Sequence, residues 1–188
     1  MRSVLISVVF MTLILGCELL KITSESDASA TNAEESRASN ISELTADKRL
    51  VQQLREDPHL SVQHNATDGS IIVVIRSGNL FNIDGATLSS TFTQILDRIV
   101  EIIIMNTAAN YEITSIGHTD EYGDPQFNMM VSKKRAEAVQ DYLVSKGIDR
   151  TLTTIEGKGS QEQIASSKTV QGRNVNRRVD LLIRLRTN

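Results

Sequence analysis

Apolar residues along this chain repeat in two ways, and each way predicts a different kind of element. The clearest helical repeat places apolar residues three and four positions apart, at Leu88, Phe92, Ile95, Ile99 and Ile103. This spacing predicts a helix that lies on a sheet. A second helix is predicted over residues 125–146, because Gly147 follows it and glycine is the commonest residue just past a helix C-terminus.

Shorter apolar runs predict strands around these two helices. From Asp84 onward we expect strands over residues 111–116, 151–156 and 177–184, so the order is helix, strand, helix, strand, strand. This order predicts an α/β (α+β) two-layer sandwich, in which a mixed β-sheet carries helices packed on one face.

A further helix is predicted in an extension that covers residues 40–76. Asn40 and Glu43 match a capping box, and Asp57-Pro58 ends the helical pattern. Between these points, apolar residues recur at helical spacing, at Ile41, Leu44, Val51 and Leu54.

The same extension contains the pattern of a hairpin. Strands are expected over residues 60–64 and 70–76, around the turn sequence Thr67-Asp68-Gly69. The run 71–75 is apolar on both faces, which predicts a strand covered on both sides or paired in an interface.

The N-terminus has the pattern of an export signal. Arg2 precedes an apolar run over residues 4–15, which is shorter than the ~20 residues of a transmembrane helix and predicts a signal peptide over residues 1–16. The run ends at Gly16-Cys17, which resembles the lipobox of bacterial lipoproteins. We therefore expect cleavage before Cys17 and lipidation of that residue.

Cys17 is the only cysteine of the chain, so no intramolecular disulfide is possible and acylation accounts for an exported thiol. Its alternative role is that of a small apolar residue in a signal anchor. Two or more acyl chains give stable membrane attachment where one does not. Glu18, in place of aspartate, favours sorting to the outer membrane.

Residues 17–39 are predicted to be a lipid anchor followed by a disordered tether. From about residue 23 this segment consists mostly of Ser, Ala, Thr, Asn and Glu, without aromatic residues or an apolar period. Such a composition cannot bury enough surface to fold. The remaining boundaries are the extension at 40–76 and a globular domain at 77–188.

Composition and charge argue against several classes of function. The net charge is −3, there is no Trp, and aromatic residues make up 4% of the chain, so no nucleic-acid partner is expected. His118 is expected to be a hydrogen-bonded structural residue, and His59 and His64 have no cysteine partner for a transition metal. Neither a metal nor another cofactor is predicted.

One polar constellation has the chemistry of a ligand site. Asp124-Pro125 is a good helix start, and Asn128, Ser132 and Arg135 follow on one face of that helix, beside Asp120. A zwitterion would meet Asp120 with its ammonium, and Arg135 and the helix amides with its carboxylate. The alternative is a salt bridge between Asp120 and Arg135 that ties loop to helix.

Three segments resemble, in order, the OmpA-like peptidoglycan-binding family of bacterial envelope domains. They are Gly117-His118-Thr119-Asp120, residues 128–136 and residues 172–179, within a resemblance that covers roughly residues 80–184. With the predicted anchor, the whole chain resembles a peptidoglycan-associated lipoprotein.

This resemblance implies roles for individual residues. Asp120 and Arg135 would hold the meso-diaminopimelate of the peptidoglycan stem peptide, and Thr119 and Asn128 would line the pocket. The resemblance extends to Asp84 and Arg177, although for Arg177 a structural role at a strand start is the alternative. Gln163 stands where Pro is common in the family, which predicts a looser loop.

The implied function is that of an outer-membrane lipoprotein, facing the periplasm, that binds peptidoglycan and links membrane to wall. The alternative is a lipoprotein subunit of an envelope-spanning machine, such as a type IV secretion complex or a motor ring, or a periplasmic regulatory lipoprotein. Residues 40–76 are where a protein partner would dock. We do not expect an enzyme, because a wall hydrolase needs a second carboxylate or a metal-bound water beside Asp120.

Overall fold

The computed structural model describes residues 48–75, 80–82, 85–106 and 111–186. The predicted signal peptide, Cys17, the tether, the capping box at Asn40 and the candidate residue Asp84 all lie outside these ranges. No helix among the described residues is both long and apolar enough to span a bilayer.

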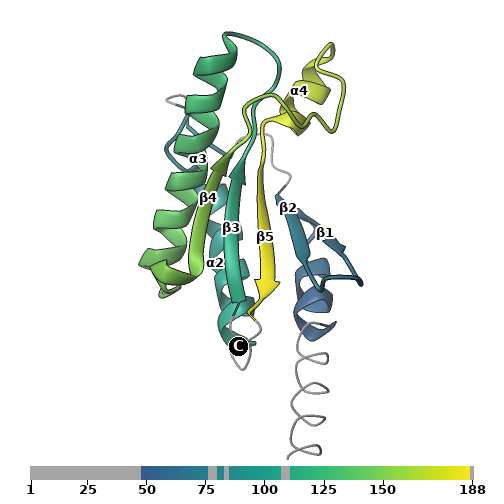
Figure 1. Ribbon diagram of the computed structural model, residues 1–188, viewed down its shortest axis with the longest axis vertical. Coiled ribbons are helices and arrows are strands. Elements are labelled where there is room, and N and C mark those ends of the chain that lie inside the picture. Colours follow the sequence, from purple (N-terminus) through teal and green to yellow (C-terminus); the bar gives the residue numbers. More distant parts are fainter. Residues whose placement is uncertain (1–47, 76–79, 83–84, 107–110, 187–188) are drawn as a thin grey trace, which may run out of the picture. The chain divides into compact units, whose positions relative to one another are not determined.

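The described chain builds one five-stranded sheet with helices packed against it (Figure 1). In chain order, a helical segment over residues 48–55 precedes the named elements. These are β1 (Leu60–His64), β2 (Ile71–Ile75), α2 (Ser90–Met105), β3 (Tyr111–Gly117), α3 (Pro125–Ser145), the 3-10 helix η1 (Arg150–Leu152), β4 (Thr153–Gly157), α4 (Val170–Asn176) and β5 (Val179–Leu185).

The strand order is β1-β2-β5-β3-β4. Strands β3 and β4 are parallel and every other pair is antiparallel, so the sheet is mixed, as predicted. Because β2 pairs with β5, the hairpin of the predicted extension shares its sheet with the domain predicted from residue 77 onward. The helical segment joins the same core through Leu50, Val51 and Leu54.

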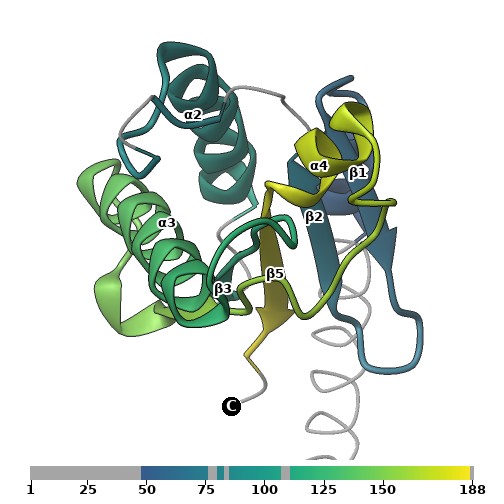
Figure 2. The ribbon, with the colours of Figure 1, turned by 90° about the horizontal axis from the view of Figure 1, so that it is seen from above.

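Alternating burial along the strands shows which face carries the helices. In β3, Tyr111, Ile113 and Ser115 are buried, whereas Glu112 is exposed. Figure 2 shows α2 and α3 on the same side of the sheet. The predicted two-layer sandwich is therefore confirmed. The inner strands β2 and β5 depart from this alternation. In β2, Val74 is buried as well as its neighbours Val73 and Ile75, in agreement with its two-sided apolar pattern.

The main helices begin and end close to where the sequence predicts. Helix α2 begins at Ser90 because Ser89 Oγ accepts a hydrogen bond from the Phe92 amide, so Leu88 lies just before the helix and not within it. Helix α3 begins at Pro125 with Asp124 as its N-cap, and Gly147 follows its end with a φ of 103°.

The sequence pattern misses η1 and α4. Residues 150–152 form η1, so β4 begins at residue 153 and not at 151. Helix α4 has only seven residues, and its apolar side chains Val170 and Val175 are exposed. A short helix without a buried stripe leaves no periodic signal. Because α4 continues to Asn176, β5 begins at Val179 and not at residue 177.

Candidate functional site

Two glycines place α3 directly against the ends of β3 and β4. Gly117 and Gly157 are partners in the parallel pairing of these strands. A Cβ on Gly117 would lie 1.9 Å from the carbonyl oxygen of Ser132, and one on Gly157 would lie 2.8 Å from the Lys133 nitrogen. Ser132 Oγ also accepts a hydrogen bond of 2.9 Å from the Gly159 amide. The ends of β3 and β4 are therefore held against the first turns of α3.

Asp120 lies in this loop and is almost fully buried. Its Oδ1 accepts a hydrogen bond of 2.9 Å from the Tyr122 amide, and its Oδ2 lies 2.6 Å from Nη1 of Arg177. The second nitrogen of Arg177, Nη2, donates to Asn174 Oδ1. Arg177 therefore belongs to the candidate site, whereas the sequence left open a purely structural role at the start of a strand.

Arg135 reaches the same region from α3. Its Nε donates to the Gly85 carbonyl at 2.7 Å, and its Nη1 donates to the His118 carbonyl at 3.3 Å. The guanidinium lies over the Phe81 ring, 4.9 Å from its centre. Arg135 forms no salt bridge with Asp120, because Arg177 is the ion-pair partner of that carboxylate. The predicted alternative of an Asp120–Arg135 bridge is therefore not what the structure shows.

The electrostatics of Arg135 reflect its position. Burial lowers the pKa of Arg135 below its usual value, the positive charge of Arg177 lowers it further, and Asp120 opposes both effects. Arginine nevertheless remains protonated in proteins. The site therefore presents two guanidinium groups around one carboxylate, an excess of one positive charge.

The other two candidates from the sequence contribute differently. Asn128 braces the loop, because its Nδ2 donates to the carbonyls of Asp120 and Tyr122 at 3.3 and 3.0 Å. Thr119 is held through its backbone, whose nitrogen donates to the Gly159 carbonyl at 2.8 Å. Its hydroxyl is buried and has no hydrogen-bond partner among the described residues. A buried hydroxyl without a partner is costly, and Thr119 is not among the residues that line the pocket beside Asp120.

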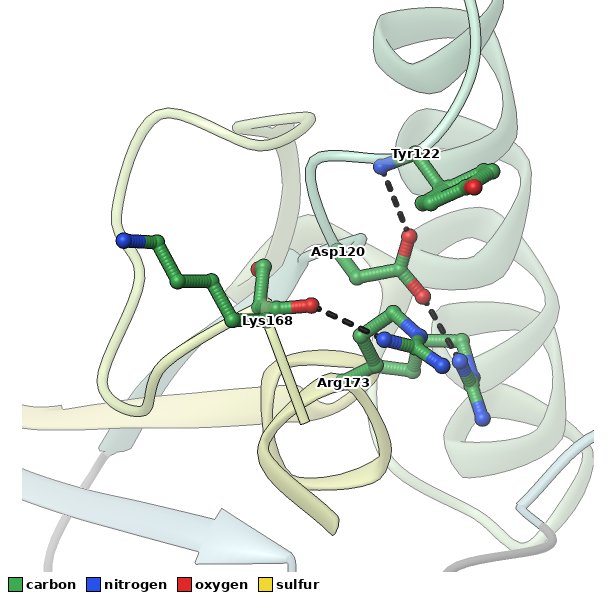
Figure 3. A pocket seen from close by; sticks show the side chains of 6 residues that line it. Asp120, Tyr122, Lys168 and Arg173 are labelled. Atoms are coloured by element: carbon green, nitrogen blue, oxygen red, sulfur yellow. Dashed lines mark hydrogen bonds and ion pairs between the residues drawn. The ribbon is translucent and has the colours of Figure 1, made fainter. Parts of the chain in front are cut away.

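Sequence reasoning missed part of the pocket beside Asp120. A cavity of about 550 Å³ is lined by Asp120, Tyr122, Ser167, Lys168, Arg173 and Arg177. Figure 3 shows how the loop of Asp120 and Tyr122 faces the chain at Lys168 and Arg173. Arg173 lies in a segment that the resemblance covers, but the stretch before it has no pattern that would place Ser167 and Lys168 here.

Gln163 shows that the loop after β4 is tied, against the expectation of a looser loop. Its Nε2 donates to the carbonyls of Thr119 and Ser160, each at 2.9 Å, and its Oε1 accepts from Ser167 Oγ at 2.8 Å. The buried side chain of Asn176 holds the same loop through the amides of Ile164 and Ala165. An amide side chain thus provides by hydrogen bonding the restraint that a proline would provide through its ring.

His118 is completely buried, and its Nε2 lies 3.2 Å from Asp180 Oδ2 without hydrogen-bond geometry. His118 is therefore a buried histidine that faces a carboxylate, and its ring does not form the expected hydrogen bond within the described residues. Among the described residues, no group of three or more His, Cys, Asp or Glu side chains lies together as a metal site would require.

Searches among known proteins find relatives over the same part of the chain. Outer membrane protein A of Bordetella avium is 41% identical over 112 residues, which are 59% of this chain and 56% of that protein. The peptidoglycan-binding protein ArfA of Mycobacterium tuberculosis is 35% identical over 103 residues, 55% of this chain and 31% of that protein. The chain thus spans about half, or less, of the length of these curated relatives.

Solved structures share the fold. The cell wall anchor of the T6SS from Pseudomonas aeruginosa superposes with a TM-score of 0.63 at 27% identity, covering 73% of this chain and 98% of that one. The periplasmic domain of Helicobacter pylori MotB has a TM-score of 0.60 at 20% identity, covering 69% of this chain and 83% of that one. At that identity the MotB domain shows the fold alone.

The family comparison covers the candidate site and part of the sheet. Residues 80–177 match the OmpA family, and this range contains β3, α3, β4 and α4 together with Asp120, Arg135 and Arg177, whereas β1, β2 and β5 lie outside it. Since the match extends over more than half of the 188 residues, the chain belongs to the OmpA family.

Proposed function

We propose that this domain binds peptidoglycan non-covalently, through the diaminopimelate of the stem peptide. The observation that carries the proposal is a buried carboxylate, Asp120, held near Arg135, whose guanidinium forms no ion pair with any described residue. A relative at 35% identity is named as peptidoglycan-binding, which supports the same ligand.

Each end of the diamino acid has a partner in this arrangement. The ammonium binds Asp120, which has two oxygens and can accept more hydrogen bonds than the two it has. The carboxylate binds Arg135, because a guanidinium can hold a carboxylate through two parallel hydrogen bonds. Thr119 adjoins Asp120 in the loop, Asn128 fixes the loop, and Arg177 orients Asp120. Asp84, which the resemblance also assigns, lies outside the described residues.

The proposed activity is binding without turnover. Among the described residues that line the pocket, Asp120 is the one carboxylate. Glycoside hydrolysis uses a pair of carboxylates across the scissile bond, and no second carboxylate lines this pocket among the described residues.

Selectivity among cell walls tests the proposed ligand. We expect the domain to sediment with sacculi that contain diaminopimelate and to bind lysine-type wall at least tenfold more weakly. Lysine lacks the side-chain carboxylate, so Arg135 would be left without its anion, at a cost on the order of 1–3 kcal/mol. Sacculi of the two types, matched by mass, are compared in a pull-down with purified domain. Equal binding to both would point to recognition of the glycan and not of the diamino acid.

We further propose that Cys17 is lipidated and anchors the protein in the outer membrane, so that wall binding links membrane to wall. The support is the sequence alone, an apolar run of export-signal length that ends at Gly16-Cys17. We expect Cys17→Ser to accumulate as unprocessed precursor, because the variant offers no thiol for acylation. Intact-mass measurement of wild type and variant checks this. A wild-type protein without acyl groups that retains residues 1–16 would contradict it.

A second candidate function is that of a wall-binding subunit in an envelope machine. The similarity to the T6SS cell wall anchor favours it, because this chain covers 98% of that structure at 27% identity. Pull-down from envelope extract, beside pull-down with purified sacculi, separates the two. Recovery of a stoichiometric protein complex supports the machine subunit, whereas recovery of wall alone supports the simple anchor.

A further inference from the structure

The pocket beside Asp120 carries more positive charge than the proposed ligand site uses. Its lining includes three cations, Lys168, Arg173 and Arg177, and one acid, Asp120. The Asp120 carboxylate pairs with Arg177 at 2.6 Å. Neither Lys168 nor Arg173 forms an ion pair within the part of the chain that the structure describes.

Of these two unpaired cations, Arg173 is the one that faces the site. Arg173 and Arg177 are four residues apart and therefore lie on the same face at the end of α4. In Figure 3 the Arg173 guanidinium lies near Asp120 and Tyr122, whereas the Lys168 ammonium points away from them. Two like charges at this spacing repel each other. The Asp120 carboxylate pairs with Arg177, so a second carboxylate would be needed to pair with Arg173.

Contacts with Ser167 and Tyr122 fix the position of the Arg173 side chain. Its Nη1 donates to the Ser167 carbonyl at 3.0 Å, and its guanidinium lies 5.8 Å from the centre of the Tyr122 ring. Ser167 is in turn bound by Gln163 and by Asn176, which is fully buried. Within the described residues, Nε and Nη2 of Arg173 form no hydrogen bond, so these donors can meet a ligand.

We propose that Arg173 binds a second carboxylate of the stem peptide, carried by the acidic residue next to the diamino acid, with Tyr122 as the adjoining wall. The inference rests on the proposed function, because Asp120 and Arg135 must first hold the diamino acid. The cavity of about 550 Å³ lies within the range of about 300 to 1,000 Å³ that is typical of small-molecule pockets, so it leaves room for a residue next to the diamino acid. The domain thereby distinguishes a stem peptide with a free carboxylate from one in which that group is an amide.

The chemistry favours a carboxylate over a neutral group at this place. A guanidinium binds a carboxylate with two parallel, charge-assisted hydrogen bonds, which are roughly twice as strong as bonds between neutral groups. An amide at the same position offers one acceptor and brings two donors against the guanidinium. The discrimination therefore comes from both a lost attraction and an added repulsion.

The test measures the affinity of the purified domain for three probes by calorimetry at constant ionic strength. The probes are free meso-diaminopimelate, the tripeptide alanyl-γ-glutamyl-diaminopimelate, and the same tripeptide with the glutamyl carboxylate converted to an amide. We expect the acid tripeptide to bind about tenfold more tightly than the amide, which is about 1.4 kcal/mol.

Two variants test whether Arg173 is the source of the preference for the acid tripeptide over the amide. Arg173→Gln keeps a side chain that can still donate to the Ser167 carbonyl, and it is expected to bind the two tripeptides equally. Lys134→Gln is the matched control, because it removes one positive charge from an exposed position of α3 that does not line the pocket, and it should keep the preference.

The outcomes separate the two proposals. Equal binding of acid and amide by the wild type, with diaminopimelate bound, overturns the role of Arg173 and leaves the proposed function standing. An unchanged preference in Arg173→Gln also overturns it. Failure of all three probes to bind overturns both. The comparison of the two tripeptides uses wild-type protein, so it holds even if the variant does not fold.

Discussion

Asp120→Asn is expected to abolish co-sedimentation of the domain with diaminopimelate-containing sacculi. The substitution removes the charge that binds the ammonium and keeps an oxygen that can accept from the Tyr122 amide. Breaking a buried, hydrogen-bonded charge pair at an interface costs about 2–5 kcal/mol, which is a loss of about 30-fold to several thousandfold in affinity. Arg135→Lys is expected to give a loss of the same order, because an ammonium cannot reproduce the two parallel hydrogen bonds of a guanidinium.

Folding must be checked separately, because Arg135 also donates to the carbonyls of Gly85 and His118. Circular dichroism and thermal unfolding of each variant provide that check. Arg150→Gln is the matched control, since Arg150 pairs with Asp141 on the surface and does not line the pocket. Undiminished sedimentation of folded Asp120→Asn and Arg135→Lys would show that the domain does not recognise diaminopimelate here.

Gly117→Ala is expected to be among the most destabilising single changes in the described domain. An added Cβ would lie 1.9 Å from the backbone carbonyl oxygen of Ser132, closer than any real contact, and backbone on both sides must shift. Overpacking of this kind typically costs about 1–3 kcal/mol and occasionally more. With backbone on both sides of the contact, we expect about 3 kcal/mol or more, measured as the loss in free energy of unfolding by urea titration.

Gly123→Ala is the matched control for this prediction. A Cβ there meets nothing within 4 Å, so the positive φ of 95° alone opposes the substitution. The cost of that conformation for an L-residue is roughly 1–2 kcal/mol. If Gly117→Ala proved no more destabilising than Gly123→Ala, the close approach of α3 to β3 would not be a determinant of stability. Loss of sacculus binding should accompany the first change, because the Asp120 loop follows Gly117 directly.

The elements that the sequence predicts well are those with long, regular patterns. Phe92, Ile95 and Ile99 form the buried stripe of α2, and the repeat alone indicates a helix on a sheet. Asp124, Pro125 and Gly147 mark the ends of α3 through local backbone chemistry that needs no tertiary contact. Helix α4 escapes prediction because it is short and exposes Val170 and Val175.

The candidate site shows a similar division. The sequence places Asn128, Ser132 and Arg135 on one helix face, and the structure shows all three buried there. It does not reveal that Arg177, 57 residues away in sequence, is the ion-pair partner of Asp120, and it leaves open a bridge to Arg135 that does not form. From the sequence, Gln163 is only a departure from the family pattern, whereas in the structure it connects the loop after β4 to the loop after β3.

The sequence by itself therefore determined the fold class, the main helices and strands, and the identity of the residues that carry charge near the loop after β3. These features follow from periodicity, capping and turn chemistry, which act over a few neighbouring residues. Only the tertiary structure decided which charges are paired, that Asn128 braces the loop while Arg177 pairs with Asp120, and that Arg173 and Tyr122 line the pocket beside Asp120. Pairing depends on distances between segments far apart in the chain, and those distances are set in part by the packing of α3 on Gly117 and Gly157.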